Sequence, residues 1–146
     1  MKSKNKTVWS VRFNNPTSKK FEQIGASIDI DKRLFEEDIF GSIVHTQMLV
    51  KQKIISKKRG IKIINGLKKI RGEIRKNKFN FNNKYEDIHL NIEKKLFSII
   101  GEDAGYLHIA RSRNDQVITD FKLWIKKASK EININLNNLI KSFLKK

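Results

Sequence analysis

Two arginines, an asparagine, an aspartate and a glutamine lie close together in residues 105–117, which read GYLHIARSRNDQV. A long amphipathic pattern follows, so these residues stand at the start of an expected helix. Backbone N–H groups and the helix dipole attract carboxylates to such a start, and the guanidinium of Arg111 or Arg113 can bind one through two parallel hydrogen bonds. These residue types therefore predict a site for a substrate that carries several carboxylates.

A purely structural interpretation of the same residues stays open. Ser112 or Asn114 would then cap the helix, and the arginines would be solvated. The spacing of the residues does not decide between the two interpretations.

Residues 85–89, which read YEDIH, place two carboxylates and an imidazole at the start of another expected helix. Glu86 and Asp87 would oppose the dipole charge there, and His89 could donate a hydrogen bond to an anion. Acidic first turns are common, so the residues alone favour a helix cap with a surface histidine.

Residues 25–28, which read GASI, form a third candidate segment. They are small enough to bring the backbone and the Ser27 hydroxyl close to a ligand, although a tight turn explains them equally well.

Helical periodicity predicts three helices that would position these segments, at about residues 31–53, 56–77 and 86–100. Asp31 and Ser56 are expected to cap the first two helices, and Gly101 to stop the third. Residues 1–30 are expected to be irregular, with a turn at Pro16 and a short segment around Phe21. Three glycines are expected to weaken the second helix: Gly60, Gly66 and Gly72.

A fourth, longer helix is predicted after residue 112. Its apolar residues recur at intervals of three or four: Val117, Phe121, Trp124, Ala128, Ile132, Leu136, Leu139 and Phe143. The stripe continues to the end of the sequence, so we expect an exposed apolar side and a chain cut off inside a helical bundle.

The composition predicts one ordinary domain, complete or incomplete, with a core of its own. There is no cysteine, and His45, His89 and His108 show no metal-ligand spacing, so we expect no disulfide, metal or organic cofactor. No signal peptide and no apolar run of about 20 residues is present. We therefore expect a cytoplasmic protein without a membrane partner.

The formal net charge of +17 raises the possibility of a nucleic-acid partner. The sequence contains 25 Lys, 22 Ile and 14 Asn, however, and codons rich in A and T encode all three. The lysines are also spread through the expected helices instead of forming one stripe with interleaved aromatic residues. We expect a solvated basic surface and no nucleic acid, and keep a basic nucleic-acid-binding module as an alternative.

Five stretches in this order resemble the argininosuccinate lyases of the fumarase and aspartase superfamily. They span Val8 to Trp124 and read VWSVRF, FEQIGASIDIDKRLFEEDI, GSIVHTQML, EDIHLNIEKKL and AGYLHIARSRNDQVITDFKLW. The SRNDQV block distinguishes this lyase from adenylosuccinate lyases and fumarases. The resemblance implies the reversible elimination of argininosuccinate to arginine and fumarate, without a cofactor.

The resemblance also implies roles for individual residues. Ser27, Arg113 and Asn114 would contact argininosuccinate, which carries three carboxylates, and Asp87 and His89 would lie at or beside the same site. Full-length relatives are homotetramers whose active sites combine residues from several subunits.

The catalytic parts of the family are missing from this sequence. In relatives a serine base lies on a loop with a GSSxMPxKxN signature, and a Thr-His segment comes from the central helices. The only proline here, Pro16, follows Asn15 instead of a methionine. We therefore expect no catalytic residue in this chain, and an amino-terminal fragment that is inactive alone.

Some positions depart from the family pattern. Ser10 and Val11 replace a usual glycine pair, and Tyr106 and Ile109 stand where a lysine and a threonine are common. The last two changes are expected to alter substrate affinity.

The predicted fold is mostly α. Residues 1–112 would form an amino-terminal helical domain, and residues 113–146 the first long helix of an incomplete central bundle. The main alternative to a lyase is a non-catalytic protein, either a truncated subunit that associates through its helical seam or the basic module.

Overall fold

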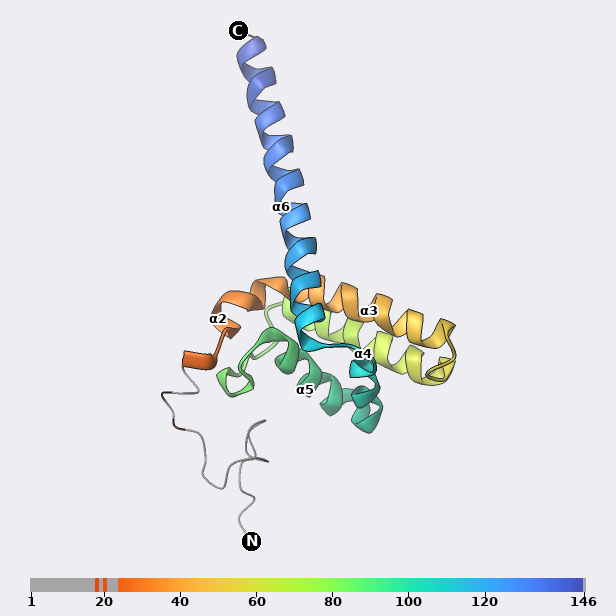
Figure 1. Cartoon of the computed structure of the whole chain (residues 1–146). Helices are drawn as coiled ribbons and strands as arrows, with labels where there is room; N and C mark the ends of the chain where they lie inside the picture. The colour runs from red at the N-terminus through yellow and green to blue at the C-terminus, as the bar shows by residue number, and fades with distance from the viewer. Residues whose placement is uncertain (1–17, 19, 21–23, 146) are drawn as a thin grey trace.

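The computed structural model describes residues 18, 20 and 24–145, and every regular element among them is helical. The mostly α prediction is therefore confirmed (Figure 1). The elements are α2 (Ile28–Asp31), η1 (Lys32–Leu34), α3 (Phe35–Lys51), α4 (Lys57–Arg75), η2 (Asn83–Tyr85), α5 (Ile88–Ile100), η3 (Gly101–His108) and α6 (Arg113–Leu144).

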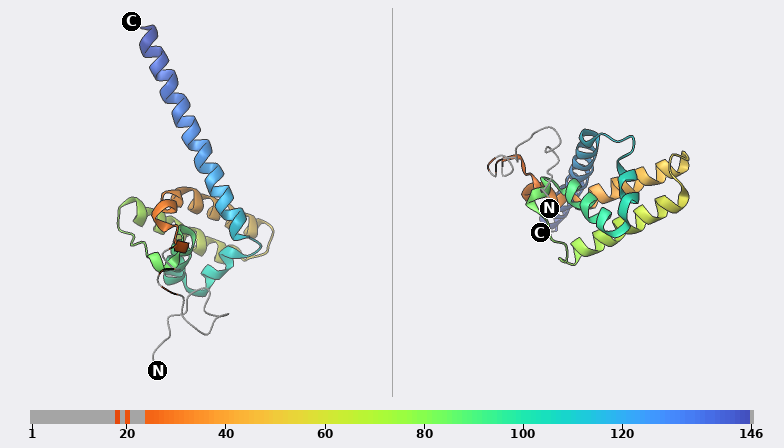
Figure 2. Two further views of the ribbon diagram at one scale, coloured as in Figure 1. Left: turned by 60° about the vertical axis from the view of Figure 1, so that its left-hand side comes forward. Right: turned by 90° about the horizontal axis from the view of Figure 1, so that it is seen from below.

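Helices α3, α4 and α5 pack together into the body of the molecule, with α4 in contact with both of the others. Figure 2 shows this body from two further sides, with α6 leaving it. The core consists of apolar residues at three- and four-residue spacing, as predicted, and its fully buried members include Ile39, Leu49, Ile63, Leu67, Ile70, Ile88, Ile92 and Leu96.

Two glycines of α4 make this close packing possible. A Cβ atom on Gly60 would collide with Val50 of α3, and one on Gly66 would collide with Leu96 of α5. The missing side chains of these two glycines let neighbouring helices approach, which is a packing role beside their expected cost in helix propensity. Gly72 has no such neighbour.

The predicted helix ends are mostly confirmed. The Ser56 hydroxyl accepts a hydrogen bond from the N–H of Arg59 at 3.3 Å, Asn77 takes a left-handed conformation just after α4, and Gly101, with a φ of 70°, ends α5. The cap at Asp31 was wrong, because helical backbone runs through this residue from α2 into η1. Its carboxylate instead accepts a hydrogen bond at 3.1 Å from the N–H of Ile88, at the start of α5.

Helix α6 projects from the body over most of its length, which Figures 1 and 2 show from several sides. The prediction of one long helix with an exposed apolar side is confirmed, since Phe121, Ile132, Leu136, Leu139 and Phe143 are all exposed. The only buried residues of this helix are Gln116 and Asp120. The helix thus meets the body with polar side chains.

The expectations about Ser10, Val11, Pro16 and the segment around Phe21 lie outside the described residues. Within the described part, no helix combines the length and the apolar character needed to cross a membrane.

Candidate functional site

The start of α6 is capped by Ser112, whose hydroxyl accepts a hydrogen bond from the N–H of Asn114 at 3.2 Å. The structural interpretation of this serine is therefore correct. The arginines beside it are not simply solvated, however. Arg113 donates from Nη1 to Gln116 Oε1 at 2.8 Å, and its Nη2 lies 2.8 Å from a carboxylate oxygen of Glu93 in α5.

Arg111 is also bound to the body of the molecule. Its Nη1 donates to Ser42 Oγ of α3 at 2.9 Å. Gly41 lies beside this contact, and a Cβ atom there would stand 3.3 Å from Asp120 and 3.5 Å from the Arg111 guanidinium. The glycine therefore leaves room for both side chains against α3.

Asp87 caps α5, as the residue types favoured. Its carboxylate accepts a hydrogen bond from the N–H of Leu90 at 2.6 Å. The companion expectation of a surface histidine was wrong, because His89 is only 2% exposed. Nδ1 of its ring donates to Oδ1 of Asp38, in α3, at 2.9 Å.

Ser27 lies at the same end of α5. Its backbone N–H donates to the carbonyl of Glu86 at 2.8 Å, and its hydroxyl donates to Asp31 at 2.6 Å. Because Asp31 also binds the N–H of Ile88, a short chain of hydrogen bonds joins Ser27 to the start of α5. Burial raises the pKa of Asp31, although the Ser27 hydroxyl opposes this by stabilising the carboxylate.

A buried polar cluster lies where α3, α5 and α6 meet, and it consists of Asp38, His89, Gln116 and Asp120. Oδ1 of Asp38 accepts hydrogen bonds from both His89 Nδ1 and Gln116 Nε2. His89 Nδ1 also lies 3.5 Å from a carboxylate oxygen of Asp120. Neither oxygen of Asp120 has a hydrogen-bond partner in the described part of the chain.

The electrostatics of this cluster favour one negative charge and one positive charge. Burial alone would raise the pKa of Asp38, but the hydrogen bond and charge of His89 outweigh it and lower that pKa. Burial would likewise lower the pKa of His89, but Asp38 outweighs it and raises that pKa. Burial and the nearby charge of Asp38 raise the pKa of Asp120 to about 8, so Asp120 is mainly neutral at pH 7.

Asp38, His89 and Asp120 are also the described residues that could together hold a metal ion, with donor atoms within 4.8 Å of one another. Two hydrogen bonds already occupy the Asp38 oxygen that points to His89. Hydrogen bonds to Asp38 account for His89 and Gln116, and a proton on Asp120 leaves that carboxyl group uncharged in its buried place.

The structure thus places the predicted residues in two groups with His89 between them. Ser27 and Asp87 lie at the start of α5, whereas Arg113 and the exposed Asn114 lie at the start of α6. Hydrogen bonds lead from His89 through Asp38 and Gln116 to Arg113.

No role was predicted for Asp38 or Asp120 from the sequence, and Gln116 stood out only as one of the polar residues in segment 105–117. A signal was present in their spacing. Asp38, Ser42 and Thr46 recur every four residues on one face of α3, and Gln116 and Asp120 are four apart on α6. All five are buried, and Asp38 and Ser42 lie against the start of α6, where apolar periodicity gives no signal.

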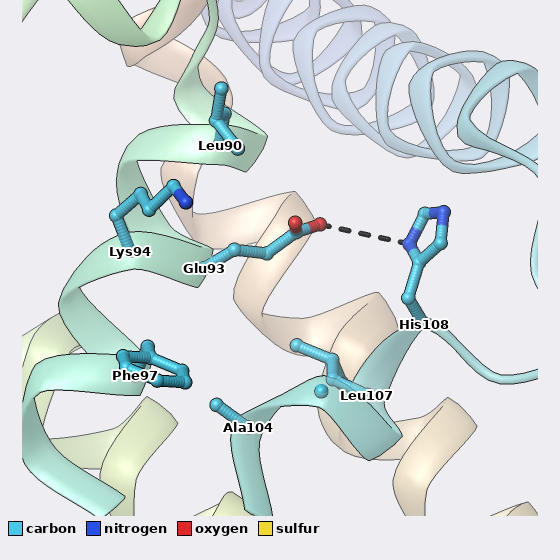
Figure 3. A pocket seen from close by; sticks show the side chains of 8 residues that line it. Leu90, Glu93, Lys94, Phe97, Ala104, Leu107 and His108 are labelled. Carbon is cyan, nitrogen blue, oxygen red and sulfur yellow. Dashed lines mark ion pairs between the residues drawn. The ribbon is translucent and has the colours of Figure 1, made fainter. Parts of the chain in front are cut away.

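A small cavity of about 150 Å³ lies beside this region, between α5 and η3. Figure 3 shows Glu93 reaching across it toward His108, whose Nδ1 is 3.7 Å from the carboxylate. Glu93 is the residue that also binds Arg113. None of the five predicted substrate residues lines this cavity, so it is not their common binding site.

Tyr106 and Ile109, which depart from the family pattern, have local partners. The guanidinium of Arg59 lies 4.0 Å from the centre of the Tyr106 ring, a cation–π contact. The carbonyl of Ile109 accepts a hydrogen bond from His45 Nε2 at 2.9 Å.

Comparison with known proteins places this chain in a family. The argininosuccinate lyase of Pelagibacter ubique (strain HTCC1062) is 63% identical over 141 residues, which are 97% of this chain and 30% of that protein. The argininosuccinate lyase of Ehrlichia canis (strain Jake) is 51% identical over 132 residues, covering 90% of this chain and 28% of that protein. The chain therefore spans about 30% of the length of the curated relatives it matches. A family model described as lyase matches residues 11–146, and the chain accordingly belongs to the lyase family.

Proposed function

We propose that this chain supplies part of the substrate site of an argininosuccinate lyase, which eliminates fumarate reversibly from argininosuccinate to leave arginine. The observation that carries the proposal is the 63% identity to an argininosuccinate lyase over almost the whole chain. In this proposal Ser27, Arg113 and Asn114 contact argininosuccinate, with Asp87 and His89 at or beside the same site.

The physical character of these residues supports a substrate with three carboxylates. Arg113 carries a fixed positive charge at the positive end of α6, and Asp38 favours the protonated form of His89 by raising its pKa. Asn114 is exposed at the same helix start, and Ser27 is exposed beside α5. The serine loop that would remove the proton has no counterpart in this sequence, so the 146 residues alone are proposed to be inactive.

The assembly and location of the protein are further parts of this proposal. Residues 1–112 would form an amino-terminal domain, and residues 113–146 would begin the central bundle of a cytoplasmic homotetramer. The exposed apolar side of α6 supports this, because such a surface is stabilised by packing against other helices.

The test is fumarate release from argininosuccinate, followed by the ultraviolet absorbance of fumarate. The complete gene product that contains these residues is compared with the 146 residues alone, and adenylosuccinate serves as the control substrate. We expect the complete product to cleave argininosuccinate but not adenylosuccinate, and the 146 residues to cleave neither. A folded complete product without activity on argininosuccinate would contradict the proposal.

A further inference from the structure

Asp38 connects the two halves of the proposed site. It is 1% exposed, and its Oδ1 atom accepts hydrogen bonds from α5, through His89, and from α6, through Gln116. The negative charge of Asp38 strengthens both hydrogen bonds. One buried carboxylate therefore fixes the position of two side chains from different helices.

Gln116 connects Asp38 to Arg113 by hydrogen bonds. Its amide has a donor end, which binds Asp38, and an acceptor end, which binds Arg113 Nη1 at 2.8 Å. Turning the amide around would set its NH₂ group against the guanidinium and its oxygen against the carboxylate. The charge of Asp38 thus decides which way Gln116 points, and so where Arg113 is held. Glu93 holds the other end of the same guanidinium.

The titratable groups that act on His89 are acidic, and the guanidinium of Arg111 lies beyond one of them, Asp120. The acidic groups are Asp38 from α3, Asp120 from α6, and Asp87 from the cap of its own helix, with Asp31 beside Asp87. Because Nδ1 is directed at Asp38, Nε2 is left for a ligand. A charged ring would present an N–H donor at Nε2 to a carboxylate.

We propose that Asp38 is a positioning residue, which orients His89 directly and Arg113 through Gln116, so that both are aligned for carboxylates of the substrate. The inference rests on the proposed function, because it concerns the same site. Asp38 itself does not touch substrate.

The test compares three variants of the complete gene product in the same fumarate-release assay, with KM, kcat and the pH profile of kcat/KM as readouts. For Asp38→Asn we expect KM to rise about tenfold, with a smaller change in kcat, because binding contacts are misplaced. The alkaline limb of the profile should also move to lower pH by about one unit, because His89 loses the charge that favours its protonated form.

Asp120→Asn replaces the other carboxyl group beside His89 with a group of the same shape. Because Asp120 is mainly neutral below its pKa of about 8 and affects His89 less than Asp38 does, this variant should move the alkaline limb less than Asp38→Asn. Asp103→Asn is the control for activity. It removes a carboxylate that binds Arg59 and Lys62 outside the cluster, and kcat/KM should stay within about twofold of the parent.

A folded Asp38→Asn protein with the parent's KM and alkaline limb would overturn the proposal. If Asp38→Asn does not fold, Gln116→Met decides, since it removes the link to Arg113 while His89 keeps Asp38. For Gln116→Met, a raised KM with an unmoved alkaline limb supports the proposal, and an unchanged KM overturns it.

Lack of activity in the parent protein would instead refute the proposed function. NMR titration of His89 in the parent and Asp38→Asn proteins then tests whether Asp38 orients and charges His89. An unchanged pKa of His89 in Asp38→Asn would overturn the proposed role of Asp38.

Discussion

Gln116 donates a hydrogen bond to Asp38 across the contact between α6 and α3, although 78 positions separate the two residues in sequence. The contact joins the long helix to the rest of the molecule through buried polar groups, with Asp38 and Ser42 on one side and Gln116 and Asp120 on the other. Polar contacts need specific partners and geometry, so they define one docking position for the helix more sharply than apolar packing would.

Replacing His89 should destabilise the protein strongly. In His89→Leu the buried Asp38 carboxylate keeps only Gln116 as a hydrogen-bond partner and loses its counter-charge. Breaking a buried pair in this way costs about 3–5 kcal/mol of unfolding free energy. Urea unfolding of the complete gene product measures it. The matched control is Glu36→Gln, which breaks the surface pair with Arg75 and should cost less than about 1 kcal/mol. Equal losses in the two variants would contradict a special role for the buried pair.

Replacing Asp120 should change how stability depends on pH. The pKa of its carboxyl group rises from an ordinary value near 3.8 in the unfolded chain to about 8 in the folded protein. The folded state therefore binds the extra proton between these values, and the free energy of unfolding falls as pH rises through this window. Asp120→Asn removes this contribution.

We expect Asp120→Asn to be more stable than the parent at pH 8 by about 1–3 kcal/mol, with a smaller difference at pH 5. Thermal or urea unfolding at the two pH values measures this. His89, whose raised pKa gives stability below about 6.5 that is lost as pH rises through the folded value, is present in both proteins. A pH-independent difference between parent and variant would contradict the assignment of a proton to Asp120.

Two glycines of α4 should respond in opposite ways to alanine. In Gly66→Ala the new methyl group collides with Leu96, so we expect a loss of about 1–3 kcal/mol. In Gly72→Ala nothing lies within 4 Å of the new atom, and alanine favours the helix, so we expect a gain of about 0.5–1 kcal/mol. Urea unfolding of both variants gives the comparison. A stabilised Gly66→Ala protein would show that α4 and α5 are not packed as closely as described.

Replacing Arg113 with lysine should impair the proposed activity although the charge is kept. Lysine cannot reproduce the planar fork that binds Gln116 and Glu93 together, so the positive group is no longer held in one place. We expect kcat/KM for argininosuccinate to fall by at least about tenfold. Arg75→Lys, in the surface pair with Glu36, is the control and should change kcat/KM by less than about twofold. Similar effects of both changes would argue against a role for Arg113 in the site.

The helices could be predicted from the sequence because their buried faces follow apolar periodicity and their ends carry capping residues and glycine. Ser56, Asp87, Gly101 and Ser112 lie where their side chains or backbone freedom satisfy helix ends, and each can be recognised from its neighbours in sequence. Asp31 is the exception, because its carboxylate accepts a hydrogen bond from the start of α5, far along the chain, and does not cap its own helix.

The polar cluster could not be predicted in the same way. Asp38 follows Glu36 and Glu37 in an acidic first turn, where a carboxylate near the helix dipole needs no further explanation. Its burial depends on which residues of α5 and α6 meet it, and no local pattern encodes that contact. The resemblance to the lyases pointed to His89 and Arg113 but not to the residues between them.

The attachment of α6 at one end has a geometric consequence. The helix contains 32 residues, which at 1.5 Å per residue is about 48 Å, and its buried side chains all lie within the first eight positions. The helix is therefore attached near one end, and any tilt of the helix is about the hydrogen-bonded cluster. A change of about 5° in the tilt of α6 at this cluster moves the carboxyl end of the helix by about 4 Å, roughly the width of a methyl group. The side chains of Gln116 and Asp120 thus determine the position of apolar residues several turns away, such as Leu139 and Phe143.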